Sequence, residues 1–152
     1  MTECIFVCTF TLIAMLYDIL SYKIPNWLVG VSLITGIAYS FVNGGKAGLL
    51  FSVCGVFIPI LLLFGLYLLG ALGAGDVKLF AAIGAFVQLK IIPVICICFL
   101  VAAPIGILAM FLNKKEKMRL YKFKVRLTKM HFAVPVFIGT AVYMIGGILY
   151  EL

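Results

Sequence analysis

Two aspartates stand in an otherwise apolar chain, and carboxylates so placed could carry out acid–base chemistry. Asp18 ends one apolar run, and Asp76 follows the glycine-rich sequence at 70–75. An ionisable group at the centre of a bilayer costs about 2.5–3.5 kcal/mol on insertion scales, so it is a functional hypothesis by default. The remaining acidic residues lie near the ends of the chain or among lysines: Glu3, Glu116 and Glu151.

A pair of carboxylates that meet inside a bundle would share one proton, because like charges close together are not easily both ionised. One member could then take a proton from water, and the other could protonate a leaving amine, as in aspartic proteases. Gly73 and Gly75 have no side chains, so a substrate backbone could approach Asp76, and their loop could adopt positive φ angles. We therefore interpret Asp18 and Asp76 as a candidate catalytic pair.

Other interpretations of the same residues stay open at this point. Asp76 could cap the helix that begins near it, since a carboxylate is favourable at a helix N-terminus. Asp18 could pair with Lys23 near the membrane interface. Intramembrane carboxylates also serve proton-coupled transport. Against transport, the chain is small and has no evident internal repeat.

The composition identifies the class of protein that must position these residues. With 66% hydrophobic residues in 152, the chain has more apolar surface than a soluble core can bury, which indicates an integral membrane protein. A crossing helix needs about 17–25 apolar residues. The sequence predicts an all-α fold, a single domain over 1–152 that forms a bundle of about six transmembrane helices. Their expected ranges are 4–21, 26–42, 48–69, 76–88, 91–112 and 132–150.

The basic residues predict the orientation in the membrane. Eight of the twelve Lys and Arg lie between Lys114 and Lys129, in a loop expected over 113–130, and such loops face the cytoplasm. Alternation then places ten basic residues inside and Lys46 and Lys90 outside. Asp18 and Asp76 would both lie at cytoplasmic helix ends. The net charge of +7 thus predicts anionic inner-leaflet lipids as partners and no nucleic acid.

The sequence predicts no metal site and no cofactor. The five cysteines lie in apolar runs without a C-x-x-C pair, and the single histidine, His131, provides neither a metal ligand set nor a triad. Lys78 lies two residues after Asp76, so on a helix it points away from that carboxylate and is expected to reach the interface.

Small residues at helical spacing predict close helix packing. One stripe comprises Ser32, Gly36 and Ser40, and a second comprises Gly139 and Gly147.

The motif residues resemble those of one peptidase family. The sequence GAGDVKL at 73–79 is similar to the GxGDxKL motif of the type IV prepilin peptidases, which are GxGD intramembrane aspartyl proteases. Asp18 with the following KIPN at 23–26 resembles that family's first catalytic aspartate and its IPN turn. Pro135 and Gly139 are similar to residues of its last span.

The resemblance implies that Asp18 and Asp76 are catalytic and that Pro25, Asn26 and Lys78 support the motifs. The implied partner is a prepilin or pseudopilin, cut at the cytoplasmic face of the cell membrane. The chain is similar to the short Tad-type forms, which lack the insert associated with N-methylation, so methyltransferase activity is not expected. The oligomeric state is left open, a homo-oligomer included.

Two functions of other classes remain as alternatives to the peptidase. These are a small proton-linked transporter and a non-catalytic assembly subunit of a pilus or secretion system.

The charge distribution yields a prediction about topology. A reporter fused after Leu152 should be active outside the cell, and one inserted near Lys122 should be active in the cytoplasm, because basic loops are retained there. Paired phosphatase and fluorescent-protein fusions measure both. The opposite pattern would separate the aspartates from a cytoplasmic cleavage site.

Overall fold

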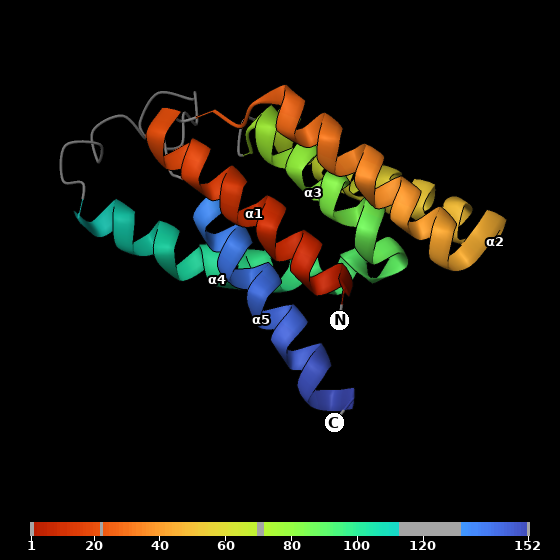
Figure 1. Cartoon of the computed structure of the whole chain (residues 1–152). Coiled ribbons are helices and arrows are strands. Elements are labelled where there is room, and N and C mark those ends of the chain that lie inside the picture. The colour runs from red at the N-terminus through yellow and green to blue at the C-terminus, as the bar shows by residue number, and fades with distance from the viewer. Residues whose placement is uncertain (1, 22, 70–71, 113–131, 152) are drawn as a thin grey trace.

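The computed structural model describes residues 2–21, 23–69, 72–112 and 132–151, with the side chains of 105–112 and 148–151 excepted. In these ranges the chain is helical and contains no strand. The elements are α1 (Thr2–Ser21), α2 (Asn26–Leu68), α3 (Ala74–Val87), the 3-10 turn η1 (Gln88–Lys90), α4 (Ile91–Leu112) and α5 (Ala133–Glu151) (Figure 1). The predicted basic loop and His131 lie outside the described residues.

Helix α2 folds back on itself at Gly45. Its 43 residues would extend about 65 Å as one rod, twice the roughly 30 Å of a bilayer core. Gly45 has φ 57° and ψ −142°, a conformation that glycine adopts without steric cost. A Cβ on Gly48 would lie 2.1 Å from the Ser40 carbonyl oxygen, so the two arms are in direct contact. Figure 1 shows the reversal where the ribbon changes from orange to yellow.

The described part of the chain has three helical segments long and apolar enough to cross a membrane. They are Thr2–Ser21, Asn26–Leu68 and Ala74–Pro104, with a shorter apolar helix at Ala133–Gly147. The chain is therefore an all-α membrane protein. This count does not support the predicted six spans, because it takes the two arms of α2 as one segment and α3, with only 14 residues, together with α4 as another.

The helices pack as two sets. Helix α3 packs chiefly against both arms of α2, and α5 packs chiefly against α4 and α1. We call these sets the α2–α3 unit and the α1–α4–α5 unit; Figure 1 shows them side by side.

Aromatic rings join the two units. Phe86 lies 6.0 Å from Phe6 and 5.9 Å from Phe10 between ring centroids. Nearer the start of α3, Phe80 lies 6.3 Å from Phe99 and 6.4 Å from Phe132 between ring centroids. Such offset and tilted pairs add about 0.5–1.5 kcal/mol beyond their burial. We refer to this boundary as the aromatic seam.

Within the α2–α3 unit, small residues allow the backbones to touch. Every residue from Leu79 to Val87 is buried. The Ser40 and Ser52 hydroxyls, one from each arm of α2, both donate to the Ala85 carbonyl oxygen, at 3.0 and 2.8 Å. Helix α3 is thus held from both arms of α2 by hydrogen bonds as well as by packing.

A substitution at the closest helix crossing should destabilise the fold. A Cβ on Gly55 would lie 2.2 Å from the Gly84 carbonyl oxygen and 2.8 Å from the Gln88 Cα, both backbone atoms. Overpacking of this kind typically costs about 1–3 kcal/mol. Gly55→Ala should therefore lower the midpoint of thermal unfolding in detergent.

Gly65→Ala is the matched control on the same helix, because a Cβ there would meet nothing within 4 Å. Equal midpoints for the two variants would contradict the crossing.

Candidate active site

Asp18 lies in the last turns of α1 on its buried face. The buried residues of this helix are Val7, Thr11, Ala14 and Asp18, whose spacing of three and four places them on one side. That spacing directs the carboxylate into the bundle, where it is 7% exposed. The backbone N–H of Ala133, the first residue of α5, donates to Asp18 Oδ2 over 3.3 Å.

Asp76 lies in the first turn of α3 and is only partly buried. We predicted a helix beginning near Asp76, but α3 begins at Ala74 with Gly73 as its N-cap residue. Asp76 is therefore the third helical residue, and its Oδ2 accepts a hydrogen bond from the Gly73 N–H over 3.2 Å. Asp76 therefore contributes to the cap of α3, but from the third helical position and not as the N-cap residue itself. Its carboxylate accepts a hydrogen bond from the amide of the N-cap residue.

The structure brings the two carboxylates to the same end of the bundle, although 57 residues separate them in sequence. The turn that follows α1 lies against the start of α3, because Lys78 Nζ contacts Asn26 Oδ1 and a Cβ on Gly75 would lie 3.7 Å from Ile24. The approach follows from the packing of α1 against α3, with Asp18 at the end of one helix and Asp76 at the beginning of the other. The pair straddles the boundary between the two units.

The two motif glycines differ in what they permit. A Cβ on Gly73 would lie 2.9 Å from Asp76 Oδ2, so glycine leaves room for the carboxylate to fold back onto its own loop. A Cβ on Gly75 would lie 3.7 Å from Ile24, an ordinary contact. Neither residue has a positive φ angle. The positive φ angles that the sequence allows in this loop are therefore not used at these two glycines.

The turn before α2 supports the start of α3. Pro25 is the N-cap residue of α2, with φ −68° and ψ 135°, and its carbonyl oxygen accepts the Leu28 N–H over 3.1 Å. Lys78 Nζ donates to Asn26 Oδ1 over 3.1 Å. This hydrogen bond joins the GAGDVKL motif at 73–79 directly to the KIPN turn at 23–26. The Lys78 side chain is exposed.

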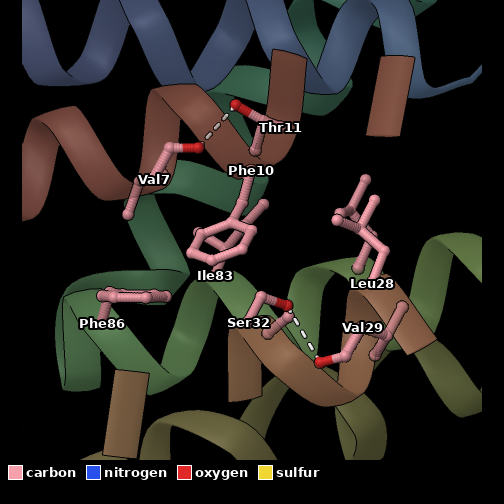
Figure 2. A pocket seen from close by; sticks show the side chains of 10 residues that line it. Val7, Phe10, Thr11, Leu28, Val29, Ser32, Ile83 and Phe86 are labelled. Atoms are coloured by element: carbon pink, nitrogen blue, oxygen red, sulfur yellow. Dashed lines mark hydrogen bonds between the residues drawn. The ribbon is translucent and has the colours of Figure 1, made fainter. Parts of the chain in front are cut away.

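Apolar space lies on two sides of α3. Figure 2 shows a small pocket at the aromatic seam, where Phe10 faces Ile83 and Phe86, and where the Thr11 and Ser32 hydroxyls bond back to carbonyls of their own helices. A larger groove of about 390 Å³ lies between α3 and the arms of α2. Ala74, Val77, Lys78 and Ala81 line this groove. These positions share one helix face, and Asp76 lies off that face.

In the described ranges, no group of three His, Cys, Asp or Glu side chains converges as a metal site would require. The described residues offer two carboxylates and backbone amides at this site.

The comparison with protein families identifies the chain. The model of the type IV leader peptidase family matches residues 5–113, which is more than half of the sequence. The chain belongs to the type IV leader peptidase family. No curated protein matches it, and no solved structure does. The matched segment of this leader peptidase contains Asp18, Asp76 and the turn at 23–26.

The sequence of this leader peptidase did not predict the role of the Ala133 amide. Every residue except proline has a backbone N–H, so the residue type does not identify this donor, and Ala133 lies 115 residues from Asp18 in the sequence. One signal was present, because Pro135 suits the first turn of a helix and marks where α5 begins. The sequence could therefore place a helix start at this position, but not the carboxylate that it meets.

The glycine geometry predicts different outcomes at neighbouring positions. Gly73→Ala should reduce leader cleavage roughly 3–10-fold, because the new Cβ displaces the Asp76 carboxylate and breaks a hydrogen bond of ordinary strength. Gly75→Ala should retain most activity, since its Cβ meets Ile24 at an ordinary distance. Initial cleavage rates on a leader-bearing substrate measure both. A larger loss at Gly75 would show that the described geometry does not control the rate.

Proposed function

We propose that this leader peptidase removes the leader from prepilin-like or pseudopilin substrates, with Asp18 and Asp76 as its acid–base pair. The observation that carries the proposal is that the end of α1, with Asp18, and the start of α3, with Asp76, lie together, since Lys78 contacts Asn26 in the turn after α1 and Gly75 faces Ile24. Family membership supports the peptidase activity, and the match contains both residues.

The chemistry follows from a proton shared between two carboxyl groups. The ionised member removes a proton from a water molecule, which attacks the scissile carbonyl carbon. The protonated member donates a hydrogen bond to the carbonyl oxygen, and the tetrahedral intermediate collapses as the leaving amine is protonated. Asp76 is more exposed than Asp18, which suits it to contact water and substrate.

The proposed cleavage site lies at the cytoplasmic face of the cell membrane. The end of α1 and the start of α3 lie together. Lys23, in the turn after α1, and Lys78, in the first turns of α3, are both exposed. Basic side chains at one end of a bundle favour the cytoplasmic side and anionic lipids. A topology of six crossings, with the arms of α2 counted separately and α3 as a short span, agrees with this orientation.

The substrate is proposed to be cleaved without N-methylation. Helix α1 ends at Ser21 and α2 begins at Asn26, so the turn between them has no room for an inserted domain. The mature terminus should leave as an unmodified amine. The peptidase needs only the two carboxylates and water for the proposed reaction.

Removing the exchangeable proton from either aspartate should abolish most cleavage. Asn keeps the size of Asp and its ability to hydrogen-bond, but it cannot exchange a proton. Asp18→Asn and Asp76→Asn should each lower the rate about 10²–10⁴-fold, and the double variant should be little worse, because the residues act as one unit. Co-expression with a candidate prepilin, followed by the leader-sized mobility shift, measures this.

Glu3→Gln is the matched control, since it removes a carboxylate from the opposite end of α1 and should leave cleavage unchanged. Chelators should also have no effect. Near wild-type cleavage by either Asn variant would exclude the pair. Proton flux into vesicles that is lost in the same variants would instead favour the transporter.

A further inference from the structure

The contact between α5 and Asp18 lies partly outside the segment that the family model matches. That match ends at residue 113, and α5 begins at Ala133. The Ala133 N–H nevertheless donates to Asp18 Oδ2 over 3.3 Å in a buried setting. Helix α5 therefore contributes directly to the surroundings of a carboxylate that the matched segment supplies.

The first turn of α5 has few backbone N–H groups that need a hydrogen-bond acceptor outside the helix. Phe132 precedes the helix, and its carbonyl oxygen accepts the Val136 N–H over 3.3 Å, so Ala133, Val134 and Pro135 occupy the first turn. The amides of a first turn have no acceptor within the helix, and Pro135 has no N–H to leave unsatisfied. Ala133 is fully buried, so its N–H needs an internal acceptor, and Asp18 provides one.

The start of α5 is held in place independently of Asp18. A Cβ on Gly139 would lie 2.7 Å from the Cys98 Cα, so α5 crosses α4 at backbone contact. Cys98 Sγ also donates to the Val136 carbonyl oxygen over 3.6 Å. These contacts with α4 fix the N-terminal end of α5 where the Asp18 carboxylate arrives.

We propose that the N-terminus of α5 positions the catalytic pair, with the Ala133 N–H orienting the Asp18 carboxylate toward Asp76. This inference rests on the proposed function. A hydrogen bond to a charged acceptor is about twice as strong as a neutral one, and the partial positive charge of a helix N-terminus adds to it. Ala133 is a positioning residue that acts through Asp18. Its loss should therefore lower kcat and leave KM nearly unchanged.

Two substitutions at Ala133 separate the amide from the volume of the side chain. Proline is well accommodated at the first position of a helix and lacks the N–H, whereas valine adds similar bulk and keeps it. Ala133→Pro should lower kcat about 10–100-fold with KM within about twofold, as expected for losing a hydrogen bond to a charged group. Ala133→Val should stay within about threefold of the wild type. Equal kcat values for the two variants, high or low, would overturn the proposal.

A thermal unfolding cycle in detergent tests the contact without cleavage. Ala133→Pro should unfold at a lower temperature than Ala133→Val in the wild-type background, and the difference should shrink in an Asp18→Ala background, where the acceptor is gone. A difference of the same size in both backgrounds would overturn the contact. A wild-type chain that cleaves no leader would refute the proposed function, and the cycle would still test the Ala133–Asp18 contact.

Discussion

A carboxylate inside an apolar bundle must find polar partners, and the described site is arranged around this requirement. Both carboxylates accept hydrogen bonds from backbone amides at helix starts. The Ala133 N–H donates to Asp18, and the Gly73 N–H donates to Asp76. Helix starts are the places in a membrane bundle where amides lack internal partners. The two carboxylates and the starts of α3 and α5 therefore satisfy one another.

The same requirement explains why α3 is interior over most of its length. A helix that begins with a partly buried carboxylate and continues through nine buried residues is held by close contacts with its neighbours. Glycines provide the close approach at Gly55 and Gly84, and serines satisfy the Ala85 carbonyl oxygen from both sides. Packing of this kind replaces the hydrophobic driving force, which is absent between helices in lipid.

The sequence predicted the features that depend on residue type. The apolar runs predicted an all-α membrane protein, and the stripe of Ser32, Gly36 and Ser40 does face α3, since a Cβ on Gly36 would lie 2.7 Å from the Ala85 Cβ. Gly139 likewise meets Cys98, but a Cβ on Gly147 would have no neighbour within 4 Å. Spacing alone cannot distinguish a contact from an exposed helix end.

Features that depend on the backbone could not be predicted in the same way. Helix α3 begins at Ala74, where the Asp76 carboxylate accepts a hydrogen bond from the Gly73 N–H. The residue types in this glycine-rich loop do not determine at which residue the helix begins. The number of spans stays a prediction, because periodicity does not tell whether a turn at Gly45 or η1 ends a membrane crossing.

The aromatic seam has a consequence for how the site is assembled. Asp18 belongs to the α1–α4–α5 unit and Asp76 to the α2–α3 unit, so the separation of the carboxylates is a property of docking, as at a subunit interface within one chain. The rings of Phe6, Phe10 and Phe86 pack across that boundary, whereas each carboxylate is fixed to its own unit by a hydrogen bond. A change in how closely these rings pack would therefore change the spacing of the two aspartates without altering either carboxylate's own hydrogen bond.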